Sequence, residues 1–165
     1  MTISNLKALF VDELKDVYSS EKQITKALPK LVKAAKHPEL KAAFQSHLKE
    51  TEGHVQRVEQ IFQILGEKPK SKTCEATKGL VEEGKEAIES DIDGDGLHDA
   101  MLVCCGQKVE HYEIATYGNL KAWATQLNLP KVVQLLEKTL NEEKAADEKL
   151  TAITGSLQLL AQGQE

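Results

Sequence analysis

The chain has 165 residues, of which 41% are hydrophobic and 28% charged, and its formal net charge is −5. This length favours a single domain over residues 1–165, with a composition typical of a soluble protein. The negative charge argues against nucleic acid and anionic membranes as partners, and no apolar run approaches the length of a membrane span.

Residues 1–5 show no basic segment followed by an apolar one, so we expect no signal peptide. The chain contains three cysteines and no Cys-x-x-Cys pair. An odd number of cysteines without such a pair fits a reducing compartment, and we expect a cytoplasmic protein. The three are Cys74, Cys104 and Cys105.

The composition favours an all-α fold, because aromatic residues make up only 4% of the chain and β-branched runs are scarce. The first helix is expected over residues 4–35, beginning at the good N-cap residue Ser4. Its apolar residues recur at alternating steps of four and three, which is typical of one buried helix face. Pro29 is expected to kink or end this helix.

A second helix is expected over residues 38–65, because Pro38 suits a first helical position and Gly66 suits a C-terminal cap. A long crossover over residues 67–96 follows it. This crossover begins and ends with polar, turn-rich segments, and its middle part predicts a short amphipathic helix over residues 74–90.

Two more long helices are expected over residues 97–127 and 130–154, joined by a tight turn before Pro130. Short connections within each pair of long helices make the pair antiparallel, and the crossover lets the second and fourth predicted helices run parallel. One such crossover is the ferritin-like form of the antiparallel four-helix bundle. The apolar face of the helix over residues 97–127 is predicted to carry Val103, Gln107, Glu110, Ile114, Tyr117, Lys121 and Ala124.

Each of the four long helices places a glutamate on or near its apolar face. Burial of an unpaired carboxylate costs several kcal/mol, so a core that collects several of them needs compensation. A pair of divalent metal ions provides it, and carboxylate oxygen with imidazole nitrogen suits iron or manganese. The four predicted ligands are Glu21, Glu50, Glu110 and Glu143.

On three of these helices a second potential ligand lies one turn away on the same face. These residues could also be solvated side chains beside the apolar face, and the whole set could form a metal-free carboxylate–histidine network. The additional ligands are His54, Glu113 and Asp147. The candidates for hydrogen-bonding neighbours of the ligands are His47, His111 and Tyr117.

The run Asp91-x-Asp93-x-Asp95-Gly96 matches the first half of an EF-hand calcium loop. Its twelfth position is Leu102, where a bidentate glutamate is required. We therefore expect an acidic turn that stabilises the N-terminus of the following helix.

Four segments resemble the YciF/YciE-type ferritin-like proteins of bacteria. They read LKDVYSSEKQ over residues 14–23, HLKET over 47–51, QKVEHYEIATYG over 107–118 and EEKAAD over 142–147. The resemblance implies a ferritin-like four-helix bundle with an extra helix in the crossover, a homodimer or higher homo-oligomer, and a link to bacterial stress responses.

The wider ferritin-like superfamily implies a ligand pattern of Glu on the first helix, Glu-x-x-His on the second, Glu or Glu-x-x-Glu on the third, and Glu-x-x-His on the fourth. This chain has Gly53 and Ala146 where the histidines are expected, and His54 and Asp147 stand one residue later. Two hypotheses follow. The first is a di-iron or di-manganese protein, which as an enzyme would be an oxidoreductase acting on oxygen or peroxide. The second is a metal-free, stress-related structural or interaction protein with a degraded di-metal site.

Overall fold

The computed structural model describes residues 3–159. Within that range every regular element is a helix, and the helix ends lie within one or two residues of those expected. The predicted all-α fold is therefore confirmed. The helices are α1 (Leu6–Ala34), α2 (Pro38–Ile64), α3 (Glu75–Glu89), α4 (Asp95–Gln126) and α5 (Pro130–Thr154).

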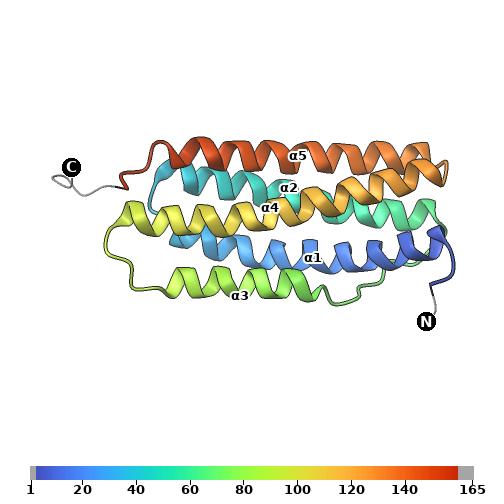
Figure 1. The fold of residues 1–165 in the computed structure, drawn as a ribbon, viewed down its shortest axis with the longest axis horizontal. Helices are drawn as coiled ribbons and strands as arrows, with labels where there is room; N and C mark the ends of the chain where they lie inside the picture. The colour runs from blue at the N-terminus through green and yellow to red at the C-terminus, as the bar shows by residue number, and fades with distance from the viewer. Residues whose placement is uncertain (1–2, 160–165) are drawn as a thin grey trace.

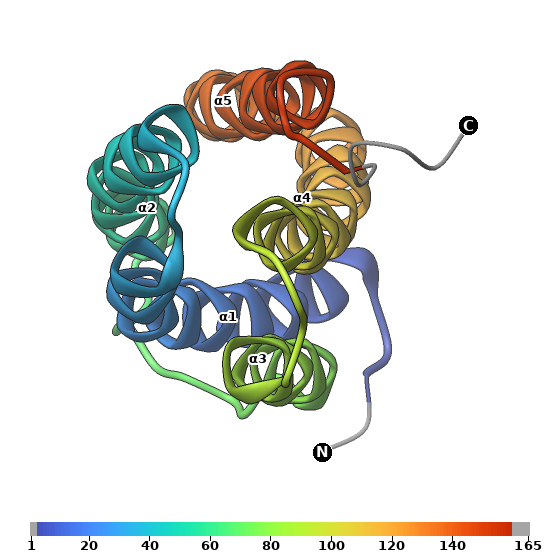
Figure 2. The same cartoon turned by 90° about the vertical axis from the view of Figure 1, so that its left-hand side faces the viewer.

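The four long helices run along one axis, with α1 paired with α2 and α4 paired with α5 (Figure 1). The crossover that contains α3 returns the chain along the bundle, so α2 and α4 run in the same direction. An end-on view places α3 outside the four-helix ring, against α1 and α4 (Figure 2). This is the predicted antiparallel bundle with one long crossover.

The ends of α1 and α2 have defined caps. The Asn5 side chain accepts a hydrogen bond from the Ala8 backbone N–H at 2.9 Å, so Asn5 is the N-cap and the prediction of Ser4 was wrong by one residue. Gly66 adopts a φ of 72° directly after the C-cap residue of α2. A side chain rarely adopts this left-handed conformation, so glycine at this position ends the helix as predicted.

Pro29 does not end α1, contrary to one of the two effects predicted for it. The helix continues to Ala34, and the residues on either side of this last turn, Leu28 and Ala35, are buried. Proline in a helix costs about 3 kcal/mol. Burial of these apolar side chains offsets that cost.

The predicted apolar face of α4 is wrong at Lys121. Its side chain is one-third exposed, and its Nζ lies 2.7 Å from Glu137 Oε1. Ile114 is only partly buried, whereas the preceding Glu113 is 2% exposed. Because α4 packs against α1, α3 and α5, it is covered on more than one side, and a single apolar face does not describe it.

The apolar core has two clusters, one toward each end of the bundle. On α1, Val17 and Tyr18 belong to one cluster and Ile24 to the other, with Glu21 between them. On α5, Glu143 likewise follows Leu140 of the first cluster and precedes the residues of the second. The fold thus places a buried acidic layer between two apolar clusters. No helix in the described range is both long and apolar enough to cross a membrane.

Candidate metal centre

Four buried side chains from three helices form the first candidate metal-binding group. One possible ligand atom from each lies within 4.8 Å of the corresponding atom on every other member. The Nε2 atom of His47 lies 3.1 Å from Glu110 Oε1 and 3.6 Å from Glu143 Oε2. We call this set the His47 group; its members are His47, Glu110, Glu113 and Glu143.

A second group of three buried residues shares Glu143 with the first. His54 Nδ1 lies 2.8 Å from Glu143 Oε1 and 3.5 Å from Glu21 Oε1. These three side chains are completely buried. We call this set the His54 group; its members are Glu21, His54 and Glu143. Two adjacent groups with one carboxylate in common offer donor atoms for two metal ions.

Many polar atoms of these groups have no hydrogen-bond partner. Although His54 Nδ1 and Glu143 Oε1 are close, they do not meet in hydrogen-bond geometry, and both are unpartnered. Buried polar groups in native proteins are normally paired, and a bound ion or water molecule is one way to pair atoms such as these. The unpartnered carboxylate oxygens are Glu21 Oε2, Glu110 Oε2, both oxygens of Glu113 and both of Glu143. This donor set of carboxylate oxygens and imidazole nitrogens fits iron or manganese.

The carboxylates repel one another in the absence of a cation. Burial raises the pKa of Glu110 and Glu113 well above the usual range, and the negative charge of Glu143 raises both further. Burial acts in the same direction on Glu143, but contacts with His54 and His47 hold the pKa of this central carboxylate below its usual value. Glu143, at the position that both groups share, is therefore ionised more readily than Glu110 and Glu113.

His54 is positioned from its outer side by a charged pair. Its Nε2 lies 3.0 Å from Glu142 Oε2, which also accepts a hydrogen bond from Arg57, and Arg57 donates to Thr139 Oγ1 at 2.7 Å. Burial lowers the pKa of His54, but contacts with Glu143 and Glu21 outweigh it and raise the pKa to about 10. The sequence-based reasoning missed Arg57 and Glu142. The available signal was Arg57 one helical turn after His54.

The structure also places the remaining predicted residues. Tyr117 donates a hydrogen bond to Glu21 and is buried in the site. Glu50 belongs to neither group: its side chain is 40% exposed, with Oε2 3.4 Å from His47 Nδ1. Asp147 is also outside both groups and lies 3.3 Å from the exposed His111. Their predicted roles as ligands, and that of His111 as a ligand's neighbour, stay predictions.

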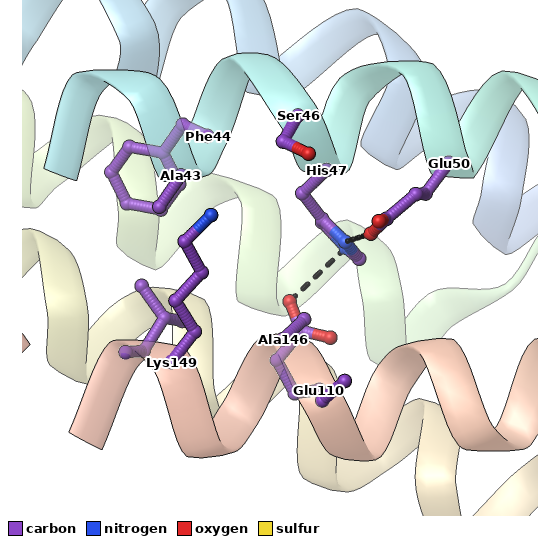
Figure 3. Close-up of a pocket in the computed structure, with 10 residues that line it drawn as sticks. Ala43, Phe44, Ser46, His47, Glu50, Glu110, Ala146 and Lys149 are labelled. Carbon is purple, nitrogen blue, oxygen red and sulfur yellow. Dashed lines mark hydrogen bonds and ion pairs between the residues drawn. The ribbon is translucent and has the colours of Figure 1, made fainter. Parts of the chain in front are cut away.

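A cavity of about 90 Å³ leads from the surface between α2 and α5 to the His47 group. Figure 3 shows Glu50 and Glu110 approaching the His47 ring, with Phe44 and Lys149 farther along the cavity. The space is small, so only small molecules or ions can enter it. The cavity is a route by which water, oxygen or a metal ion can reach the site.

A family model described as a domain of unknown function, DUF892, matches residues 5–161. The chain belongs to the DUF892 family. Among its relatives is Protein YciF of Escherichia coli strain K12, which is 45% identical over 152 residues, or 92% of this DUF892 chain and 91% of the relative.

Solved structures support the same relationship. The E. coli stress protein YciF matches with a TM-score of 0.90 and 43% identity, over 93% of this DUF892 chain and 97% of the other. YcfI of Rhodopseudomonas palustris, whose description proposes a structural role, matches with a TM-score of 0.86 and 44% identity. The match covers 90% of this chain and 94% of YcfI. A Bacillus anthracis protein described as ferritin-like and diiron-carboxylate matches with a TM-score of 0.70 at 16% identity. The match covers 92% of this chain and 99% of the other. At this identity it shows the ferritin-like fold alone.

Proposed function

We propose that this protein binds a pair of iron or manganese ions in the bundle core and acts on oxygen or peroxide during bacterial stress. The single observation that carries the proposal is the pair of buried groups that share Glu143 and leave carboxylate oxygens without partners. The His54 group would hold one ion, and the His47 group would hold the other. The name of YciF as a stress protein and the diiron-carboxylate description of the B. anthracis protein support the proposal.

A bound iron or manganese pair would supply Lewis acidity and reversible electron transfer to an oxygen species. The protein's own side chains prepare the site for it. Tyr117 fixes one oxygen of Glu21, and Glu50 contacts the outer nitrogen of His47. Outer contacts of this kind orient ligands and raise metal affinity. The two apolar clusters pack against the acidic layer from both ends of the bundle.

Anaerobic loading with Fe(II) or Mn(II), followed by metal analysis, tests the proposal. We expect close to two metal ions per chain and, for the iron form, an absorbance change when oxygen is admitted. Glu143→Gln should lose most of the metal, because both groups use this residue. Glu148→Gln, an exposed change on the same helix, is the matched control. Metal content well below one ion per chain, unchanged by Glu143→Gln, would contradict the proposal.

A second candidate function is a metal-free stress protein that acts as a structural or interaction scaffold. The close approach of His54 to Glu143 and of His47 to Glu110 favours it, since protonated histidines compensate buried carboxylates without a metal. The structural role proposed in the description of YcfI supports the same view. In a metal-free scaffold, Glu21→Gln combined with Glu143→Gln should lower the melting temperature by the same amount with and without added metal, because the buried His54 loses the carboxylates that compensate its charge.

We also propose that the chain forms a homodimer or higher homo-oligomer. Leu97 and Met101 lie one turn apart on α4 and are 45% and 43% exposed, so they offer a small apolar contact for a second copy of the chain. Light scattering coupled to size exclusion measures the mass directly. A monomeric mass at micromolar concentration contradicts this part of the proposal.

A further inference from the structure

A second, larger cavity of about 130 Å³ lies between α1, α3 and α4. Its inner end is formed by Phe44, His47 and Glu110, which also line the smaller cavity in Figure 3. The crossover helix α3, seen outside the four-helix ring in Figure 2, forms its outer wall. This cavity therefore reaches the candidate metal centre from a different side of the bundle.

The wall of the larger cavity is mainly aliphatic. Water gains few hydrogen bonds in such a space, and apolar cavities of this kind stay dry unless an apolar molecule enters. A dry void also forfeits the dispersion contacts of the side chains that line it. The aliphatic side chains that line the space come from all three helices and include Ile24, Leu28, Leu80, Val81, Ile88 and Val109.

A glycine on α3 keeps this space open. Gly84 is buried, yet a Cβ atom added there would meet no atom within 4 Å. At Gly106, by contrast, an added Cβ would lie 3.1 Å from Leu150, so close packing explains that glycine. Glycine inside a helix costs about 1 kcal/mol relative to alanine. No neighbour explains the missing side chain at Gly84, and its absence enlarges the cavity.

The rim of the cavity carries a net positive charge. It contains Lys30, Lys85 and one acid, Glu82, whose carboxylate lies 3.3 Å from Lys85 Nζ. Among the described residues, Lys30 Nζ forms no ion pair, since no carboxylate oxygen lies within 4.0 Å of it. The acidic side chain of Glu110 lies at the inner end of the cavity. A ligand with an apolar tail and an anionic head is therefore favoured with its tail inward and its head at the rim.

We infer that this cavity binds a short aliphatic carboxylate, with its tail toward Glu110 and His47 and its carboxylate beside Lys30. The size follows from comparison with a known apolar cavity of about 150 Å³ that holds benzene, which sets the whole ligand near six carbons. Binding itself does not require a metal. Only the further role of such a molecule as a substrate rests on the proposed function, because its tail would end beside the candidate metal centre.

Calorimetric titration of the metal-free, 165-residue chain with butanoate, pentanoate and hexanoate tests the inference. Affinity should rise about fourfold with each added methylene, as expected for transfer of a methylene out of water. Hexylamine should bind more weakly than hexanoate, since its charge is repelled at the rim. Lys30→Glu should weaken hexanoate binding and leave hexanol binding unchanged. An affinity independent of chain length would overturn the inference.

Gly84→Leu places a side chain in the cavity and should lower hexanoate affinity by about tenfold or more. The matched control is Gly79→Leu, an exposed position on the same helix where an added Cβ also meets nothing. It gains the same helix propensity and leaves the cavity open. Gly84→Leu should also raise the melting temperature, because it fills a void. Equal hexanoate affinity in both variants would place the ligand elsewhere.

Methyl-resolved NMR locates the ligand in the unaltered protein, whatever the variants do. Hexanoate should shift the methyl signals of Ile24 and Val109 and leave those of Ile61, in the other apolar cluster, unchanged. Hexanoate binding without any metal binding would contradict the proposed function and leave this inference standing. Metal binding with no hexanoate binding, in either the metal-free or the loaded protein, would overturn the inference alone.

Discussion

The hydroxyl of Tyr117 on α4 donates a hydrogen bond to Glu21 on α1, across the interior of the bundle. The two side chains are 1% and 0% exposed. Burial and the charge of Glu21 raise the pKa of Tyr117 well above its usual value, so the hydroxyl keeps its proton and remains a donor. The bond engages Oε1 of Glu21, which also lies 3.5 Å from His54 Nδ1, and leaves Oε2 without a partner.

Tyr117→Phe should therefore lower both metal affinity and stability. Loss of an outer hydrogen bond to a ligand typically costs about 10- to 100-fold in metal affinity. Leaving a buried acceptor unsatisfied costs about 1–3 kcal/mol of the free energy of unfolding of the metal-free protein. Calorimetric Mn(II) titration and urea unfolding in the presence of a chelator measure the two effects.

Tyr18→Phe is the matched control for this change. Tyr18 also donates to a glutamate, Glu59, at 2.7 Å, but that pair lies outside both candidate groups. It should lower stability modestly and leave metal affinity unchanged. Equal losses of metal affinity in the two variants would show that the Tyr117 bond has no specific role at the site.

Asp99 should be important for stability alone. It is 1% exposed, and its carboxylate accepts hydrogen bonds from the backbone N–H groups of Lys36 at 2.9 Å and His37 at 2.6 Å, in the turn between α1 and α2. Asp99→Ala would leave these donors unpaired, so we expect a loss of about 1–3 kcal/mol in the free energy of unfolding. Asp95→Ala, an exposed change in the first turn of α4, should cost less than about 1 kcal/mol. A loss of metal affinity in Asp99→Ala, measured while the protein is folded, would contradict a purely structural role.

Most of the fold could be predicted because it depends on local rules. Proline at Pro38 and Pro130 begins helices, glycine at Gly66 ends one, and the spacing of apolar residues sets the helix lengths. Burial of Glu21 and Glu143 was also predicted, since both interrupt a regular apolar face. These features depend on residues within a few turns of each other.

The orientation of α4 could not be predicted in the same way. One apolar face predicts Ile114 and Lys121 in the core, but α4 packs against α1, α3 and α5, and Glu113 is buried instead. Burial was equally hard to predict at His54 and Asp147, which stand one residue after the histidine positions of the superfamily pattern. Each one-residue step turns a side chain by about 100° around the helix. His54 is nevertheless fully buried and Asp147 is not, which depends on the neighbouring helices.

The metal-free protein should lose stability as the pH rises from 6.5 to about 10, the ordinary and the folded pKa values of His54. A raised histidine pKa stabilises the folded state fully below 6.5, and this stabilisation is lost as the pH passes the folded value. The raised pKa values of Glu110 and Glu113 act in the same direction, because the unfolded state releases its protons first. The lowered pKa of Glu143 matters only in acid.

Urea unfolding in the presence of a chelator, repeated across this pH range, measures the trend. Glu113→Gln should flatten it, since this substitution removes one of the carboxyl groups that ionises late in the folded state. Saturating Mn(II) should reverse it, because metal ligands must be deprotonated before they bind. A stability that rises with pH in the metal-free protein would contradict the arrangement of charges described for the core.

Glu50 and Asp147 separate the sequence-based ligand set from the one that the geometry favours. The sequence predicts both as ligands, whereas the structure places Glu50 beside His47 and Asp147 beside His111, outside the two groups. If the ligands are the members of the two groups, Glu50→Gln and Asp147→Asn should each lower Mn(II) affinity by about tenfold at most. This is the lower end of the loss expected when a contact to a ligand is removed.

Glu143→Gln should instead lose most of both metal ions, because the two groups share it. Metal analysis and calorimetric titration of the three variants, with Glu148→Gln as the exposed control, give the comparison directly. A loss in Glu50→Gln as large as that in Glu143→Gln would mean that the Glu50 side chain turns inward to bind. The ligand pattern implied by the family resemblance would then hold for α2, and metal binding would require a rearrangement of the half-exposed side chain next to His47.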